Sequence, residues 1–265
     1  MDTEVQYVQG TNRRKSLEAA GRRFVRRCRG AALDLLFPSA CAGCGAEMDA
    51  AVGTPFCSGC VGRLPLLPGA TCVRCGAPVP GLVPRKGCYT CGGTKLWFDE
   101  TVALGRYDGL LREWLLRMKH GRGESLGLAV AKLVWLHHAE RLVAMRPDVV
   151  VPVPMHWRRR LVRGTNSPAI LADRLAERLH LPHAIDLLCR TRHTPPQFSL
   201  PPSERPRNVR GAFSVRTGYH LESARVLVVD DVLTTGSTCS AIARALKLRG
   251  ASCVAIAVIG RSSRR

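Results

Sequence analysis

This sequence has few acidic residues, few lysines and few aromatic side chains, and it lacks a long hydrophobic run. Its 265 residues contain no stretch of about 18 apolar residues, which excludes a membrane-spanning helix. The basic N-terminal residues are not followed by an apolar stretch and a small-residue cleavage site, so we expect no secretory signal. Hydrophobic residues make up 46% of the chain, which is enough for a sizeable core. At about 150 residues per domain, the length corresponds to roughly 1.8 domains.

The shortage of acids leaves the chain strongly basic. Forty basic residues oppose 20 acids, for a formal net charge of +20, and six of the basic residues are lysines. A GC-rich coding sequence would explain arginine in place of lysine, but not twice as many bases as acids. The charge therefore favours contact with nucleic acid or another polyanion. Because four Trp, four Tyr and six Phe must also supply the core, few remain for base stacking, and we expect this contact to be mainly electrostatic.

Cysteine, in contrast, is abundant and regularly spaced. Eight of the twelve cysteines form four C-x-x-C pairs, which are separated by 12, 11 and 12 residues. A C-x-x-C turn holds two thiolates about 3.5–4 Å apart, and two such turns complete a tetrahedral zinc site. The glycines after three of the pairs, Gly45, Gly76 and Gly92, are expected to supply the positive φ of the turn. The predicted zinc ligands are Cys41, Cys44, Cys57, Cys60, Cys72, Cys75, Cys88 and Cys91.

Two other chemistries also use cysteine pairs. A disulfide framework is disfavoured because no secretory signal is visible, and a thioredoxin-like redox site needs one pair rather than four. We therefore expect two structural zinc ions, each held by four thiolates. Sequential pairing of the motifs closes the shorter loops and forms two tandem zinc ribbons, and interleaved pairing stays open as an alternative. Cys189, Cys239 and Cys253 are expected to pack in the core.

A further motif joins a buried strand to a helix near the C-terminus. Residues 226–229 form an apolar run typical of a strand buried on both faces, and a helix is expected over residues 239–248. Backbone N–H groups and hydroxyls at the start of a helix suit a phosphate, and two acids at the end of a strand can bind sugar hydroxyls or help to hold Mg²⁺. An ordinary capped turn is the alternative. The predicted phosphate-binding residues are Asp230, Asp231, Thr234, Thr235, Gly236, Ser237 and Thr238.

Strands and helices alternate through most of residues 149–259, which predicts an α/β fold with a parallel sheet and helices on both faces. The stretch 157–164 contains four arginines, which suits pyrophosphate or a nucleic-acid backbone, with a solvated loop as the alternative. The other expected elements are helices near 111–119, 125–141 and 168–180, strands at 149–153 and 253–259, and a long loop at 190–211.

The order of these motifs resembles the ComF family, in which a double zinc ribbon precedes a type I phosphoribosyltransferase-like domain. The resemblance covers about residues 33–262. The acid pair and the hydroxyl-rich turn look like the signature with which type I phosphoribosyltransferases bind phosphoribosyl pyrophosphate (PRPP). Where the family shows Arg-Gly-Phe-Asn-Gln, this chain has Thr165 and Ser167 in place of the aromatic residue and the amide. The other shared motifs include the cysteine pairs, Val151 to Pro154, Arg163 with Asn166, Thr194 with Gln197, and Arg205 with Asn208.

The resemblance implies a cytoplasmic, PRPP-binding protein that handles single-stranded DNA during DNA uptake, together with a helicase-like competence ATPase. It implies that Asp230 and Asp231 contact the ribose hydroxyls, with Mg²⁺, and that residues 234–238 hold the 5-phosphate. The alternative is an active phosphoribosyltransferase with an unknown acceptor, for which Asp230, Asp231 and Lys119 are the candidate catalytic residues. A 5′-phosphorylated strand end is a third candidate ligand of the turn. The candidate contacts of pyrophosphate or nucleic acid are Lys119, Arg158, Arg163, Arg205 and Asn208.

We expect three parts in the chain: a basic N-terminal segment over residues 1–32, a double zinc ribbon over 33–95 and a phosphoribosyltransferase-like domain over 96–265. The N-terminal segment fits a basic amphipathic helix or a disordered tail. Eight thiolates and two Zn²⁺ lower the net charge from +20 to about +16 and remove the positive charge of the ribbon region. The polyanion-binding surface is therefore expected on the C-terminal domain and the N-terminal segment.

Overall fold

The computed structural model describes residues 40–48, 53–67, 69–81, 87–119, 123–154, 166–192, 194–195 and 197–262. The N-terminal segment and the arginine-rich stretch 157–164, for which the sequence makes predictions, lie outside these residues. By its contacts the chain forms two compact units, Met1–Cys57 and Ser58–Arg265. The main sheet belongs to the second unit. The boundaries of the three expected parts of the chain, at residues 32/33 and 95/96, stay predictions.

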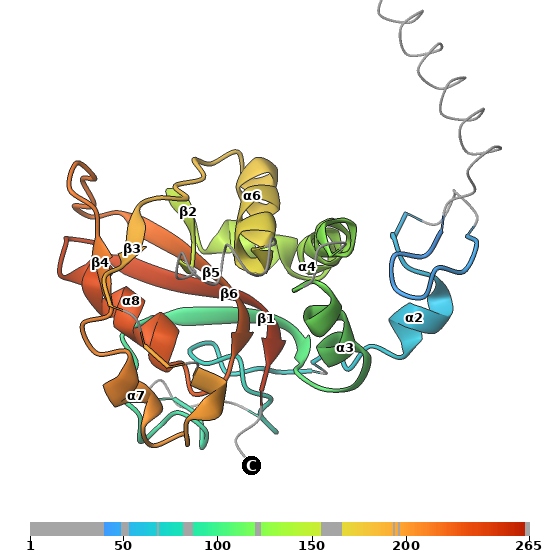
Figure 1. Cartoon of the computed structure of the whole chain (residues 1–265), viewed down its shortest axis with the longest axis horizontal. Coiled ribbons are helices and arrows are strands. Elements are labelled where there is room, and N and C mark those ends of the chain that lie inside the picture. The colour runs from blue at the N-terminus through green and yellow to red at the C-terminus, as the bar shows by residue number, and fades with distance from the viewer. Residues whose placement is uncertain are drawn as a thin grey trace, which may run out of the picture. The chain divides into compact units, whose positions relative to one another are not determined.

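A four-stranded parallel sheet forms the centre of the second unit (Figure 1). Its strands, in spatial order, are β1 (Glu100–Arg106), β6 (Cys253–Arg261), β5 (Arg225–Leu233) and β2 (Val149–Pro152). The register places Val226 of β5 between Val149 of β2 and Val254 of β6. Both central strands are apolar over most of their length, as strands buried on both faces must be. The predicted parallel α/β fold is confirmed.

Helices cover both faces of this sheet (Figure 1). They are α3 (Gly109–Arg117), α4 (Glu124–Ala144), α6 (Ser167–Leu179) and α8 (Ser237–Lys247). The α4 and α6 helices pack on each other and on one face, whereas α8 packs on the other. Val226 joins the apolar cluster that contains Ile242 of α8, and the next residue, Leu227, points to the opposite face. This alternation explains why β5 has no polar face before Asp230.

The expected helices near 111–119, 125–141 and 168–180 are present as α3, α4 and α6, within a few residues. The strand expected at 226–229 is longer, because β5 continues to Leu233 and includes the acid pair. Asp230 is thus held in register opposite Val258 of β6 rather than in a flexible turn. None of the described helices is long and apolar enough to cross a membrane.

The long loop expected at 190–211 contains short regular elements, which corrects that expectation. β3 (Leu188–Arg190) pairs antiparallel with β4 (Phe213–Val215), and the segment between them includes η1 (Gln197–Ser199) and α7 (Arg205–Asn208). Elements of three or four residues are too short to show a hydrophobic period, so the sequence pattern does not predict them. β1 was not predicted either, although Val102 to Leu104 are apolar.

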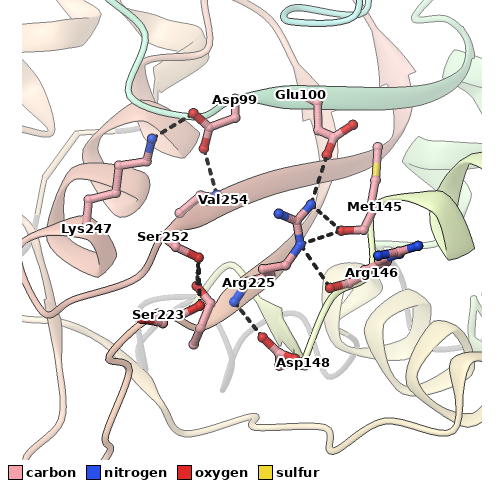
Figure 2. Close-up of polar contacts among 11 residues, drawn as sticks. Asp99, Glu100, Met145, Arg146, Asp148, Ser223, Arg225, Lys247, Ser252 and Val254 are labelled. Carbon is pink, nitrogen blue, oxygen red and sulfur yellow. Dashed lines mark hydrogen bonds and ion pairs between the residues drawn. The ribbon is translucent and has the colours of Figure 1, made fainter.

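Polar side chains secure the edge of the sheet at which β5 begins (Figure 2). The guanidinium of Arg225 donates hydrogen bonds to the carbonyl oxygens of Met145 and Arg146, just after α4, and its Nη2 lies 2.6 Å from the Met145 oxygen. The same side chain lies 3.9 Å from the Glu100 carboxylate. Asp148 accepts a hydrogen bond of 2.7 Å from the backbone N–H of Arg225. These contacts fix the start of β5 to the end of α4.

Asp99 has the same effect at the start of β6. It accepts a hydrogen bond of 2.8 Å from the N–H of Val254 and lies 2.7 Å from Nζ of Lys247, the last residue of α8 (Figure 2). The amino ends of the central strands are thus tied to the ends of the flanking helices. Open α/β sheets bind ligands at the other edge, at the carboxyl ends of their strands.

Candidate functional site

The carboxyl end of β5 leads through a tight turn into α8. We call residues 234–238 the phosphate loop; Ser237 begins α8. Gly236 has a φ of +78°, in the left-handed region, and a Cβ added there would lie 3.3 Å from the ring of Phe98. Glycine is therefore required for both the backbone conformation and the close packing.

Hydroxyl groups line the turn. The side-chain oxygens of Thr235 and Ser237 lie 2.8 Å apart, and the N–H of Ser237 points at Thr235 Oγ1 over 3.4 Å. The first N–H groups of a helix have no partner within the helix, and they carry the positive end of its dipole. Backbone donors, hydroxyls and a helix N-terminus together form an arrangement that suits a phosphate.

A cavity of about 600 Å³ opens at this edge of the sheet. Its volume lies in the range of small-molecule sites. The predicted residues that line it are Lys119, Arg205, Asp230, Asp231, Thr234, Thr235, Gly236, Ser237 and Thr238. The structure thus brings the whole predicted turn, the acid pair and two predicted cations to one cavity, and their roles in binding stay predictions. Asn208 does not line this cavity, and Arg158 and Arg163 lie outside the described residues.

Two cations reach the acid pair and the phosphate loop from different parts of the chain. Nζ of Lys119, just after α3, lies 3.2 Å from Oδ2 of Asp231. Arg205, at the start of α7, donates from Nη1 to Thr234 Oγ1 at 3.1 Å and from Nε to the carbonyl of Leu200 at 3.1 Å. The cavity therefore has one cation at the acid pair and one at the first residue of the phosphate loop.

Asn208 is connected to the phosphate loop through Gln197. Its Nδ2 donates to Gln197 Oε1 at 3.0 Å, and Gln197 Nε2 in turn lies 3.4 Å from Thr238 Oγ1. Gln197 lines the cavity although it is absent from the predicted site residues. Asn208 is thus placed to orient Gln197 rather than to touch a ligand itself.

Several cavity residues are not among the predicted ones. Arg112 and Leu116 line the cavity together with Lys119, at a spacing of four and three residues, so they lie along one side of α3 and its end. This helical spacing is a signal from which Arg112 could have been predicted. Asn166, the N-cap of α6, also lines the cavity, and its Oδ1 is buried without a hydrogen-bond partner among the described residues.

The acid pair has a strongly perturbed electrostatic environment. Burial and the adjacent charge of Asp231 raise the pKa of Asp230 well above the usual carboxyl range, and Lys119 offsets this rise only in part. Burial and the same two carboxylates also raise the pKa of the Cys239 thiol, whose sulfur lies 3.9 Å from Asp230. Cys239 is buried, as predicted for a core residue, and stays a neutral thiol. Asp231, in contrast, has Lys119 as a counter-ion.

The paired cysteines form two groups of four, and in each group the sulfur atoms all lie within 4.8 Å of one another. The first cluster is Cys41, Cys44, Cys57 and Cys60, and the second cluster is Cys72, Cys75, Cys88 and Cys91. The sulfurs of Cys44 and Cys57 in the first cluster lie 3.7 Å apart, and three pairs of sulfurs in the second cluster lie 3.6–3.9 Å apart. A tetrahedral Zn²⁺ with Zn–S bonds of about 2.3 Å requires separations of about 3.8 Å, so both clusters fit a structural zinc ion. The motifs pair sequentially rather than interleaved.

Backbone N–H groups favour the thiolate at one cysteine of each cluster. Burial opposes ionisation of Cys41, but hydrogen bonds from backbone N–H groups outweigh it and lower its pKa to about 6. The same balance lowers the pKa of Cys88 to about 7. Burial raises the pKa values of Cys75 and Cys91. The second cluster therefore needs a bound cation to hold all four sulfurs as thiolates.

The glycine positions of the cysteine turns are confirmed in two of three cases. Gly45 and Gly76 have φ values of +78° and +66°. Gly92 has no positive φ, so the prediction for it was wrong. The positive φ of that pair, +105°, belongs to Gly87, where a Cβ would lie 2.8 Å from the sulfur of Cys91.

Two solved structures are similar to part of this chain. A purine phosphoribosyltransferase from Pyrococcus horikoshii matches 49% of this chain and 70% of its own, with 22% identity and a TM-score of 0.33. An allosteric regulatory enzyme of purine biosynthesis matches 56% of this chain and 30% of its own, with 26% identity and a TM-score of 0.38.

Sequence comparison gives a closer relationship. A double zinc ribbon domain matches residues 32–92, and a phosphoribosyl transferase domain matches residues 168–264. Competence protein F of Haemophilus influenzae is 29% identical over 199 residues, which cover 74% of this chain and 85% of that protein. DNA utilization protein YhgH of Escherichia coli is 31% identical over 188 residues, which cover 70% of this chain and 81% of that protein. With both domains in the same order and relatives matched over most of their length, this chain belongs to the ComF family.

Proposed function

We propose that this protein binds PRPP with Mg²⁺ in the cavity at the carboxyl edge of its sheet, and that it acts in the handling of single-stranded DNA. The observation that carries the PRPP proposal is the convergence of the phosphate loop, an acid pair and two cations on one cavity of about 600 Å³. Support for the DNA role comes from relatives that are named for competence and for DNA utilization.

Each part of PRPP has a chemically matched partner in the cavity. The phosphate loop holds the 5-phosphate, because its N–H groups and hydroxyls lie at the positive end of α8. Asp230 and Asp231 accept hydrogen bonds from the ribose hydroxyls. Lys119 gives up its contact with Asp231 and, together with Arg205, neutralises the pyrophosphate. Mg²⁺ bound together with PRPP would compensate the charge of its phosphate groups.

Calorimetric titration of PRPP and Mg²⁺ into the zinc-loaded full chain tests this assignment. We expect saturable binding at one site per chain and a loss of at least about tenfold in affinity, 1.4 kcal/mol, for Asp231→Asn. Asp173→Asn is the matched control, because Asp173 is an exposed carboxylate on α6 that does not line the cavity. Absence of saturable binding to the wild-type protein, or an equal loss in both variants, would refute the PRPP assignment.

The DNA proposal draws on the excess charge and on one aromatic side chain flanked by cations. Trp97 has Nζ of Lys95 4.9 Å and Cζ of Arg244 5.8 Å from its ring centre. An aromatic ring beside basic groups suits single-stranded nucleic acid, whose bases stack while its phosphates are neutralised.

Fluorescence anisotropy with a labelled oligothymidylate tests this surface. Arg244→Ala is expected to weaken binding severalfold. Arg178→Ala, in the last turn of α6, is expected to leave it unchanged, although both arginines are exposed near the end of a helix. Equal effects of the two substitutions would contradict the proposed surface. The helicase-like ATPase partner stays a prediction from the family resemblance.

A second candidate function is phosphoribosyl transfer. The acid pair with a cation 3.2 Å away favours it, since such a site can stabilise the charge that develops as pyrophosphate leaves. Pyrophosphate release from PRPP, measured with nucleobases and ammonia as acceptors and lost in Asp230→Ala, would establish it. PRPP binding without release of pyrophosphate would favour the binding role.

A third candidate ligand of the phosphate loop is a 5′-phosphorylated strand end. Binding of oligonucleotides with and without a 5′-phosphate tests it, because the affinity is expected to depend on the phosphate if the loop holds a strand end.

A further inference from the structure

Arg261, the last residue of β6, is a buried cation between the second cysteine cluster and the phosphate loop. Arg261 is 5% exposed to solvent. Nε donates to the carbonyl oxygen of Cys75 at 2.8 Å, and Nη1 donates to the carbonyl oxygens of Leu233 and Thr234 at 3.0 and 2.7 Å. Nη1 also contacts the carbonyl of Ser262. One side chain thus joins a cysteine turn to the first residue of the phosphate loop.

The described partners of Arg261 are neutral carbonyl groups. Among the residues that the structure describes, no carboxylate lies within ion-pair distance of it. A buried charge is costly unless an opposite charge compensates it. The second cluster offers such a charge, because four thiolates and one Zn²⁺ sum to −2 and Cys75 belongs to it. Metal-bound thiolates therefore favour the buried guanidinium electrostatically.

Apolar contacts connect the same two regions. The ring of Phe98 and the side chain of Leu96 lie 3.3 and 3.4 Å from the position of a Cβ on Gly236. Both side chains belong to the buried cluster that includes all four cysteines of the second cluster. A small cavity of about 10 Å³ is lined by Cys75, Cys91 and Gly236, among other residues. The second cluster and the phosphate loop therefore share one packed layer.

We propose that Arg261 is a positioning residue through which the metal-loaded second cluster fixes the geometry of the phosphate loop. Loss of metal from this cluster frees the Cys75 turn, to which Nε of Arg261 is bonded, so Arg261 no longer restrains Leu233 and Thr234. Metal occupancy of the second cluster, and not of the first, then controls phosphate binding. The proposal rests on the proposed function in one respect, namely that the loop binds a phosphate.

Hydrogen–deuterium exchange of the full chain, read at residues 230–240, tests the restraint without any ligand. Arg261→Met and Cys88→Ser are both expected to raise exchange in this segment at least about tenfold, and Cys88→Ser also loses one zinc per chain. Cys44→Ser is the matched control: it loses the zinc of the first cluster, and exchange at residues 230–240 stays as in the wild type. PRPP titration is expected to follow the same order, with about tenfold weaker binding for Arg261→Met and Cys88→Ser only.

Two further variants separate positioning from general destabilisation. Arg225→Met removes another arginine that binds backbone carbonyls, at the opposite edge of the sheet, and is expected to leave exchange in the loop unchanged. Arg261→Lys keeps the charge but not the forked donors, so it is expected to restore part of the protection. If Arg261→Met does not fold, Arg261→Lys alone tests the proposal. Exchange at residues 230–240 that stays as in the wild type in Arg261→Lys would contradict a restraint by the forked donors of arginine.

The proposal is overturned if Cys88→Ser loses its zinc while residues 230–240 exchange as in the wild type, or if Cys44→Ser raises exchange there as much as Cys88→Ser does. Wild-type exchange in a folded Arg261→Met would overturn it as well. If the wild-type chain binds no PRPP, the proposed function fails, but the exchange pattern still decides the role of Arg261.

Discussion

Asp230 is a carboxyl group held in a buried strand directly beside a second carboxylate. Burial and the charge of Asp231 both disfavour its ionised form, which raises its pKa. The side chain lines the cavity, where Oδ1 accepts a hydrogen bond of 2.9 Å from the backbone N–H of Asp231. A ligand that brings Mg²⁺ or another cation to the pair would favour the ionised form that the free protein opposes.

The first prediction concerns the stability of Asp230→Asn as a function of pH. A carboxyl group whose pKa is raised on folding stabilises the folded state fully below its unfolded pKa of about 3.9, and this stability is lost as pH rises toward the folded pKa, at up to about 1.4 kcal/mol per pH unit. Asparagine does not ionise, so the variant is expected to gain stability relative to the wild type with rising pH. Melting temperatures between pH 4 and 8, with Asp173→Asn as the control, measure this. A pH-independent difference would contradict the prediction.

The second prediction concerns Gly236→Ala. An alanine with a positive φ costs about 1–2 kcal/mol, and the added Cβ would also press on Phe98. We expect lower stability together with at least tenfold weaker PRPP binding in calorimetry. Gly218→Ala is the matched control, since Gly218 has a φ of +92° and open space around its Cβ position. It is expected to lose similar stability without losing PRPP affinity, and equal binding losses would contradict a specific role of the loop geometry.

At the scale of elements, the parts that could be predicted from sequence are those with a strong local pattern. The β5–α8–β6 unit has a continuous apolar run, a glycine-containing turn and a helical period, and each survives in the structure. β1 was not predicted because it is an edge strand that depends on pairing with β6, more than 140 residues away in sequence. β3, η1, α7 and β4 are set by tertiary packing rather than by periodicity.

The candidate site shows the same division. The acid pair and the phosphate loop are contiguous in sequence, so their chemistry could be predicted directly. Arg112, Gln197 and Asn166 come from three separate segments and meet only when α3, η1 and α6 are folded around the cavity. Arg261 was missed because a single arginine at the end of a strand has no motif, and its role depends on carbonyl groups of two other segments.

The third prediction belongs to the amino edge of β5. Arg225→Met removes the hydrogen bonds to the carbonyls of Met145 and Arg146, but the side chain is 39% exposed, so water replaces part of them. We expect a loss of about 1 kcal/mol in the free energy of unfolding by urea. PRPP affinity is expected to stay within about twofold, because the cavity lies at the other edge. If the free energy of PRPP binding falls by more than the free energy of unfolding, the amino and carboxyl edges of the sheet are coupled.

At the scale of the whole molecule, zinc changes where the positive charge lies. With both clusters metallated, the region 38–95 has a net charge of about −1, while residues 96–265 retain about +13. Of the described cations, Arg207 on α7 and Arg244 on α8 belong to this basic region, and α7 contacts α8. The C-terminal domain is thus expected to supply the surface that single-stranded DNA contacts.

The fourth prediction follows from this distribution of charge. The affinity for oligothymidylate is expected to fall linearly on a log–log plot against salt concentration, with a slope of about −0.7 for each phosphate neutralised. Arg207→Glu is expected to weaken binding and to make the slope shallower by about 0.7 or more, because it removes a cation on α7, which contacts the helix that carries Arg244. Arg63→Glu reverses the charge of another exposed arginine, in the ribbon region, and is expected to change the slope little. Anisotropy titrations between 50 and 300 mM KCl measure both, and a larger effect of Arg63→Glu would move the DNA-binding surface to the ribbons.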